Sequence, residues 1–169
     1  MNKVYIMKGA ILLKKRVIFI SSTGGHFSEL MMLKPIFDEY DYHLVTEKTM
    51  SNISLKEEYK KRIHYLIYGT RVNRVKYFFK TTLNTIKSLA LFIKIRPHAI
   101  VTTGTHTAMP MCIIGKILGA KIVFIETYAN VYTPTGSGKY IYKFADEFIV
   151  QWEELLKVYP KATYLGGIF

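Results

Sequence analysis

The chain of 169 residues has a single cysteine, Cys112, which lies in an apolar run. One thiol cannot form an internal disulfide, so the sequence is typical of a protein from a reducing compartment, with Cys112 as a small core residue. The sequence also lacks any apolar stretch of 18 or more residues, and it therefore predicts no transmembrane span. The apolar stretch at 9–13 is too short for a cleaved signal peptide, and lysines follow it directly.

Acidic residues are absent from two long segments. Residues 1–16 carry five basic residues and residues 71–96 carry seven, and together these equal the formal net charge of +12. Charge placed so locally indicates an anionic partner surface, either acidic lipid or nucleic acid. We expect residues 1–15 to form a basic leader, which is either a second membrane-contacting surface or a disordered segment.

Short apolar runs alternate with amphipathic segments along the rest of the chain. Strands are expected at 17–22, 42–46, 63–68, 99–103, 121–126 and 147–151, and helices at 26–40, 73–95, 107–118 and 139–145. A polar connection is expected at 52–62, and a turn of helix leads to 163–165. Pro35 is expected to kink or shorten the first helix. The alternation predicts an α/β fold, a Rossmann-like parallel sheet with helices on both faces, in a single domain over 16–169.

Polar turns follow three of the expected strands. They are Ser22–His26, Thr103–Thr107 and Glu126–Asn130. In open parallel sheets, ligands bind beyond the carboxyl ends of the strands, so we expect the three turns to line one crevice. Glycine in such turns permits positive φ and close approach, and the helix that follows offers unpaired amides to an anion. A simple strand-to-helix bend, with a histidine as polar filler, is the alternative for the first turn.

Two histidines and a glutamate in these turns are the candidates for a general base: His26, His106 and Glu126. The same three side chains suggest a metal site as the alternative. We expect no metal, because the ligands would come from three separate loops without local H-x-x-x-H spacing. The candidate substrate-binding residues are Thr23, Gly24, Gly25, Thr103, Gly104, Thr105, His106 and Asn130.

The basic segment 71–96 has apolar residues at three- and four-residue steps, which predicts an amphipathic helix. Further apolar residues widen its apolar face beyond the need of one core contact, and a broad apolar face rimmed by lysine and arginine suits an anionic membrane. A core helix with a solvated face is the alternative, and nucleic acid is disfavoured because no recognition motif is present. The candidate membrane-contacting residues are Arg74, Lys76, Phe78, Lys80, Lys87 and Phe92.

Three stretches of the sequence resemble the Alg-fourteen-like family. They are STGGHFSEL, VTTGTHTAMPMCIIGKILGAKIVFIET and ADEFIVQWEELLKVYPKATYLGGIF, and the resemblance covers residues 16–169. It implies the N-terminal, acceptor-binding half of a MurG-like glycosyltransferase with the GT-B fold, whose nucleotide-binding half is a separate polypeptide. The bacterial relatives, of the PssD, CpsF and EpsE type, serve exopolysaccharide and capsule assembly. This chain has FIET where many members have FIES, and it lacks the N-terminal transmembrane helix of eukaryotic members, which favours peripheral membrane binding.

The resemblance implies an acceptor-binding, membrane-associating subunit of a two-component, inverting UDP-sugar glycosyltransferase. It would act without a cofactor at the cytoplasmic face of a bacterial plasma membrane, peripherally or monotopically. There it would present an undecaprenyl-diphosphate-linked sugar to a donor-binding partner of the Alg-thirteen or PssE type. His26 is then expected as the base or as a ligand of the acceptor diphosphate, with Glu126 as the second catalytic residue. Ile168 and Phe169 are expected to contact the partner. A non-catalytic scaffold that recruits and activates the transferase is the alternative.

Overall fold

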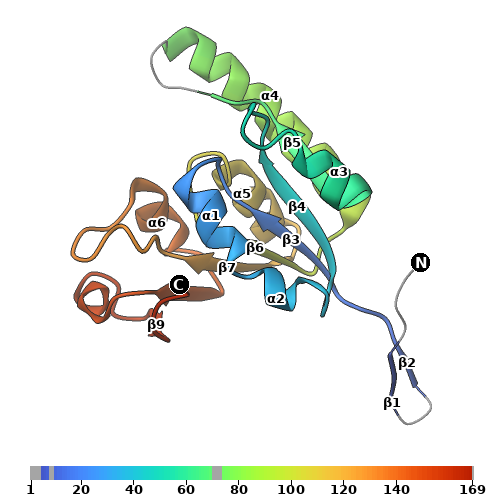
Figure 1. Ribbon diagram of the computed structural model, residues 1–169. Coiled ribbons are helices and arrows are strands. Elements are labelled where there is room, and N and C mark those ends of the chain that lie inside the picture. Colours follow the sequence, from blue (N-terminus) through green and yellow to red (C-terminus); the bar gives the residue numbers. More distant parts are fainter. Residues whose placement is uncertain (1–4, 8–9, 70–73, 169) are drawn as a thin grey trace.

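The computed structural model describes residues 5–7, 10–69 and 74–168 (Figure 1). Its centre is a seven-stranded sheet in the order β5-β4-β3-β6-β7-β8-β9, in which every neighbouring pair is parallel. The strands are β3 (Arg16–Ile20), β4 (Asp41–Glu47), β5 (Ile63–Leu66), β6 (Ala99–Thr102), β7 (Lys121–Ile125), β8 (Glu147–Val150) and β9 (Thr163–Tyr164). The predicted Rossmann-like parallel sheet is therefore confirmed.

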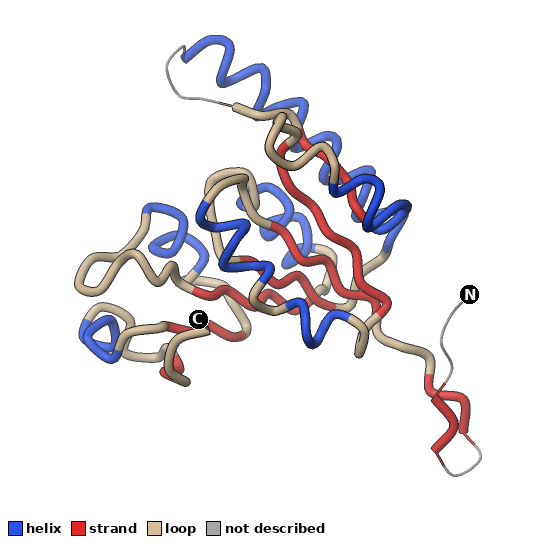
Figure 2. Tube along the Cα trace, viewed as in Figure 1, coloured by secondary structure: helices blue, strands red, loops and turns tan. Residues whose placement is uncertain are grey.

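Helices cover both faces of the sheet (Figure 2). The first face carries α4 (Arg74–Ile95), α5 (Met109–Ile117) and α6 (Gly136–Ile141), and the other carries α1 (Gly25–Met31), α2 (Lys34–Phe37) and α3 (Leu55–Tyr59). Strand β3 shows why two cores form: Ile18 and Ile20 enter the core of the first face, while Val17 and Phe19 enter the core of the second. The sheet is thus buried on both sides, as its near-continuous apolar strands require.

Two of the expected helices differ from the observed ones. The segment 26–40 forms two helices, because Pro35 takes an early position in α2, where a proline fits, and the chain turns between them. The helix expected at 139–145 begins three residues earlier, at Gly136, because the hydroxyl of Thr135 accepts a hydrogen bond from the Gly138 amide at 3.0 Å and caps it. The connection at 52–62 contains α3 and the 3₁₀ helix η1 (Lys60–Arg62), and a second 3₁₀ helix, η2 (Glu153–Lys157), leads to β9.

The described part of the basic leader forms a small antiparallel hairpin of β1 (Tyr5–Met7) and β2 (Ala10–Leu12). Figure 1 shows this hairpin apart from the seven-stranded sheet. Within the described ranges, no helix is both long enough and apolar enough to cross a bilayer.

Candidate functional site

The three polar turns follow three strands that are neighbours in the sheet, β3, β6 and β7. The chain reverses its direction of winding between β3 and β6, because β3 has β4 on one side and β6 on the other. In open α/β sheets this reversal opens a crevice at the carboxyl ends of the two strands, where ligands bind. The first two turns face each other across this position.

Gly24 enables the first turn. Its φ is +83°, a backbone conformation that side chains rarely adopt, and a Cβ placed there would meet no atom within 4 Å. Its carbonyl accepts hydrogen bonds from the amides of Phe27 and Ser28, which closes the first turn of α1. The surface of the turn is therefore bare backbone, to which another molecule has close access.

Two hydrogen bonds join His26 to the second turn. The hydroxyl of Thr103 donates to the His26 carbonyl at 2.7 Å, and Nδ1 of His26 lies 2.9 Å from the Thr103 carbonyl oxygen. A carbonyl can only accept, so Nδ1 carries the hydrogen and Nε2 of the neutral ring keeps its lone pair. The ring is about one-quarter exposed. The bond to Thr103 thus holds the orientation of the His26 ring and involves only Nδ1, not the basic nitrogen Nε2.

Gly104 lies in the second turn beside the His26 imidazole, and its backbone conformation is what calls for glycine. Its φ is +98°, and a Cβ there would lie 3.6 Å from the His26 ring and 3.5 Å from the hydroxyl of Ser137. The Gly104 amide donates to the hydroxyl of Thr102 at 3.0 Å, which anchors the turn to the end of β6. Gly24 and Gly104 thus both lie, with positive φ, where the first turn meets the second.

Glu126 is turned into the protein. Its carboxylate is buried and accepts hydrogen bonds from the Thr127 amide, from the amide and hydroxyl of Thr135, and from the hydroxyl of Tyr159, at 2.8–3.2 Å. Burial and the nearby carboxylate raise the pKa of Tyr159, so that hydroxyl stays protonated and donates. These bonds indicate that the Glu126 carboxylate holds the loop at 127–135 in place. Because the carboxylate is buried, a substrate has no direct access to it for proton transfer. Asn130 strengthens the same loop through a bond to the Thr133 carbonyl at 3.0 Å.

Glu29 joins the third turn to His26, a role not predicted from the sequence. Its Oε1 accepts from the Thr127 hydroxyl at 2.6 Å and from the Tyr128 amide at 3.0 Å. Its Oε2 lies 3.9 Å from Nδ1 of His26. The available signal was the spacing, because residues three apart share a helix face, so an acid three positions after His26 belongs beside it.

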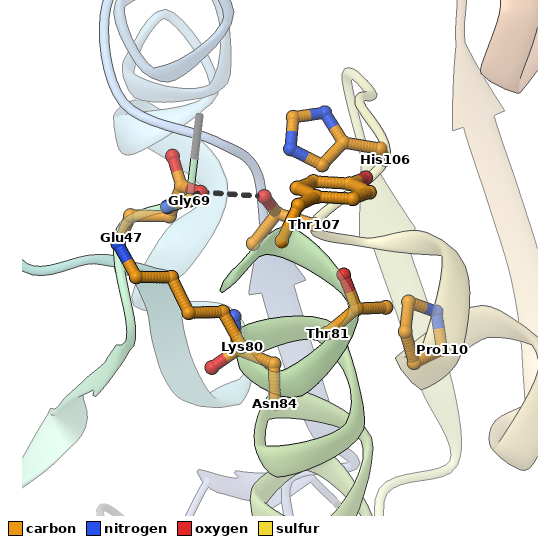
Figure 3. A pocket seen from close by; sticks show the side chains of 9 residues that line it. Glu47, Gly69, Lys80, Thr81, Asn84, His106, Thr107 and Pro110 are labelled. Atoms are coloured by element: carbon orange, nitrogen blue, oxygen red, sulfur yellow. Dashed lines mark hydrogen bonds between the residues drawn. The ribbon is translucent and has the colours of Figure 1, made fainter. Parts of the chain in front are cut away.

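Glu47 holds a second polar pocket, at the end of β4 (Figure 3). Its buried carboxylate accepts a hydrogen bond from the Thr107 hydroxyl at 2.8 Å and lies 3.4 Å from the Thr23 amide. The pocket also receives Lys80 from α4 and His106 from the second turn, and its free volume admits about one water molecule. His106 lines this pocket and His26 does not, so the two expected histidines do not form one pair. Sequence reasoning missed Glu47, although it directly follows the strand expected at 42–46, because no small polar turn marks that strand end.

The remaining turn residues lie at the edge of these contacts. The hydroxyl of Thr23 is 3.5 Å from that of Thr49, and the hydroxyl of Thr105 is 3.4 Å from Nδ1 of His106. Gly25, the first residue of α1, would accept a Cβ without contact, so its position does not demand glycine. Across the described ranges, no three His, Cys, Asp or Glu side chains are placed to hold a metal ion.

The C-terminal segment is tied to the third turn through Gln151. Its side-chain amide donates to the Glu126 carbonyl at 2.9 Å, and its oxygen accepts from the Ile168 amide at 3.0 Å. Ile168 is partly exposed, and Phe169 lies outside the described residues. The tail thus ends close to the wall of the crevice.

Helix α4 has an unusual distribution of side chains. The residues that face the body include Asn84 and Ser88, and both are buried. Asn84 pairs its amide group with the backbone of Ile67, through two bonds of 2.8 Å. Seven large apolar side chains face outward and are 41–67% exposed, beside the exposed Thr82 and Thr85: Val75, Phe78, Phe79, Leu83, Ile86, Leu89 and Ile93. Figure 1 shows the first turns of α4 reaching beyond the sheet.

One expected membrane contact on α4 is wrong. Phe92 is only 6% exposed and packs in the core together with Ile95, because it lies on the inward face of the helix. Phe78, by contrast, is 67% exposed. The side chain of Arg74 lies outside what the structure describes.

The lysines of α4 lie along one flank of the helix. Lys76, Lys80, Lys87 and Lys94 are spaced by four and seven residues, which places them in one row. Lys80 is half-buried and donates to the Tyr68 carbonyl at 3.0 Å, so this row faces the sheet edge at β5. The other three lysines are exposed.

Comparison with known proteins supplies the family context. The family model described as "Oligosaccharide biosynthesis protein Alg14 like" matches residues 16–168. The UDP-N-acetylglucosamine transferase subunit ALG14 of Mus musculus is 27% identical, and the match covers 90% of this chain and 82% of that protein. The corresponding subunit of Schizosaccharomyces pombe is 29% identical and is covered to 83%, again with 90% of this chain.

Solved structures match the fold. MurG of Acinetobacter baumannii superposes with a TM-score of 0.67 at 18% identity, over 83% of this chain and 42% of its own. UDP-N-acetylglucosamine 2-epimerase of Rickettsia bellii gives a TM-score of 0.69 at 16% identity, over 92% and 45%. The chain therefore spans less than half of each of these proteins, and it corresponds to one Rossmann-like half of a GT-B-type fold.

Proposed function

The chain belongs to the Alg14-like family of oligosaccharide biosynthesis proteins, and on this premise we propose that it is the acceptor-binding subunit of a two-component, inverting UDP-sugar glycosyltransferase. Two facts support this division of labour. The relatives are named as subunits, and the chain spans less than half of the two-domain neighbours. The donor sugar nucleotide would then be held mainly by a separate donor-binding subunit.

The observation that carries the proposal is the geometry of His26. The Thr103 carbonyl fixes the Nδ1–H form, and Nε2 is left as a base at the crevice between β3 and β6. In the proposed reaction, an acceptor hydroxyl attacks the anomeric carbon of the UDP-sugar while Nε2 takes its proton. The new C–O bond forms opposite the bond to UDP, which breaks and releases the nucleotide, so the anomeric configuration inverts. No cofactor enters this scheme.

The acceptor is proposed to be a lipid-diphosphate-linked sugar, such as an undecaprenyl-diphosphate sugar in exopolysaccharide or capsule synthesis. The exposed backbone at Gly24 and Gly25 would give a sugar or diphosphate close access next to His26, while Gly104 is buried against the ring. Thr23, Gly25, Thr105, His106 and Asn130 would border the same substrate. Glu126 is proposed to act by holding the third turn, since its carboxylate is saturated with donors.

Helix α4 is proposed to bind the cytoplasmic face of the bacterial plasma membrane. Its outward apolar stripe lies opposite the polar side chains that it buries, and its lysine row suits anionic headgroups. The stripe has a neighbour in α5, where Ile113 and Ile117 are also exposed. Membrane binding would bring the acceptor's lipid to the side of the molecule on which α4 lies.

Activity of the reconstituted complex tests the proposal. The chain is purified with its donor-binding partner and supplied with UDP-N-acetylglucosamine and a short-chain prenyl-diphosphate monosaccharide. His26→Ala is expected to lower kcat about 100-fold or more, because general-base catalysis typically contributes that much. Ser28→Ala, on the exposed side of α1, is the control and should keep the wild-type rate. A His26→Ala complex with near wild-type kcat would refute the base and support a scaffold that activates its partner.

A further inference from the structure

We propose that Glu29 is a positioning residue for His26, one that balances the positive charge on the imidazole when it takes the acceptor's proton. The inference rests on the proposed function of His26. It comes from the burial of Glu29 and from the unequal surroundings of its two carboxylate oxygens.

One oxygen of Glu29 has a structural role. Oε1 accepts both the Thr127 hydroxyl and the Tyr128 amide, and this fixes the third turn to helix α1. These two bonds connect residues about one hundred positions apart in the chain. They satisfy one of the two carboxylate oxygens, Oε1.

The other oxygen, Oε2, makes no structural hydrogen bond of this kind within the part of the chain that the structure describes. Oε2 is buried and has no hydrogen-bond partner among the described residues, and it lies 3.9 Å from Nδ1 of His26. Glu126 provides the contrast, because donors reach both of its oxygens. A buried carboxylate oxygen without a donor is costly, so a nearby cation gains strongly from it.

The reaction supplies that cation. When Nε2 of His26 accepts the hydroxyl proton, the ring becomes an imidazolium, and its Nδ1–H stays bonded to the Thr103 carbonyl. The positive charge is then close to the buried carboxylate of Glu29, and burial of one partner reduces solvent screening and strengthens the attraction. Glu29 need not exchange a proton with the ring to stabilise this state.

Two substitutions separate the charge of Glu29 from its structural bonds. Glu29→Gln keeps an oxygen for Thr127 and Tyr128 but removes the charge. Thr127→Val keeps the charge but removes the hydroxyl's bonds to Glu29 and to the Ala129 amide. In the reconstituted complex, Glu29→Gln is expected to lower kcat about 30-fold, with KM changed less than about twofold. The acid limb of its kcat/KM profile should move to lower pH, because the uncharged neighbour no longer favours the protonated ring. Thr127→Val should leave that limb in place and lower kcat less than about threefold.

The possible outcomes are distinct. If His26→Ala abolishes activity while Glu29→Gln keeps the wild-type kcat and pH profile, the role of Glu29 is refuted and the base stands. If His26→Ala remains active, the proposed base fails, and the role of Glu29 fails with it. Should Glu29→Gln not assemble into the complex, Glu29→Asp provides the same test. Its carboxylate lies farther from the ring, so the acid limb should move in the same direction by less, and an unmoved limb would refute the inference.

Discussion

Helix α4 and the crevice at the carboxyl edge depart from the usual distribution of side chains in opposite ways. In α4, apolar side chains face outward while Asn84 and Ser88 are buried. At the carboxyl edge, carboxylates are buried while bare glycine backbone faces outward. Exposed apolar stripes and buried carboxylates are both unusual in an isolated domain, and under the proposed function each of these surfaces would be completed by another molecule. In the proposal, the difference matches the kind of molecule: an apolar layer for α4 and a polar substrate for the crevice.

The largest expected effect comes from the crevice. Glu126→Ala would leave the buried donors of Thr127, Thr135 and Tyr159 without their acceptor. We expect the free energy of unfolding, measured by urea titration, to fall by about 3–5 kcal/mol. Glu147→Ala, at an exposed carboxylate on β8, is the control and should change it by less than about 0.5 kcal/mol.

Two glycines of α6 allow the same clamp to be tested while Glu126 itself is left in place. A Cβ on Gly138 would collide with the Glu126 carboxylate and lie 2.6 Å from the Tyr159 hydroxyl, while a Cβ on Gly136 would meet nothing within 4 Å. Gly138→Ala should therefore destabilise the fold and Gly136→Ala should not. Equal stability of the two variants would contradict the clamp assigned to Glu126.

The next largest effect concerns the outer face of α4. Replacing Phe78, Phe79 and Ile86 together by serine removes apolar area that is already exposed, so the free energy of unfolding should change by less than about 1 kcal/mol. Binding to vesicles that contain phosphatidylglycerol should fall about 100-fold, because interfacial binding scales with buried apolar area. Co-sedimentation measures it, and Met50→Ser with Leu165→Ser, at exposed apolar residues outside α4, is the control. Unchanged vesicle binding of the triple variant would remove α4 as the membrane surface.

The smallest effect tests the polar lining beneath α4 through pH. Burial, the neighbouring His43 and nearby lysines, including Lys94 of α4, lower the pKa of His64 to about 4. Its unfolded value is 6.5, so the unfolded chain binds the proton more tightly, and the stability that the neutral ring contributes is present above pH 6.5. It is lost as pH falls from 6.5 toward 4. Over that window we expect a loss of about 2 kcal/mol in urea titrations.

A substitution isolates that contribution. Nδ1 of His43 lies 3.1 Å from Nε2 of His64, so neither ring gains a proton without disturbing the other. His64→Gln should flatten the pH dependence between 6.5 and 4, while His98→Gln, at an exposed histidine, should leave it as in the wild type. A His64→Gln protein with the wild-type slope would place the acid sensitivity elsewhere.

The sequence allowed the sheet and the three turns to be predicted, because strand runs and small polar turns are local signals. Gly24 and Gly104 show this well, since the ability to adopt positive φ belongs to glycine itself and can be read from the residue type. The orientation of α4 was beyond such signals: periodicity groups residues onto a face but does not decide which face packs, and Phe92 was misplaced for that reason. Glu29 and Glu47 were missed because their burial arises only when distant turns meet.

Gln151 has a consequence for assembly. A single side-chain amide holds both the Ile168 end of the chain and the Glu126 end of β7. Any molecule that restrains the tail therefore also restrains the crevice wall, and by reciprocity a substrate that orders the wall makes the tail easier to grip. If the proposed partner grips the tail and the proposed acceptor binds at the crevice, Gln151 would couple the two binding events thermodynamically.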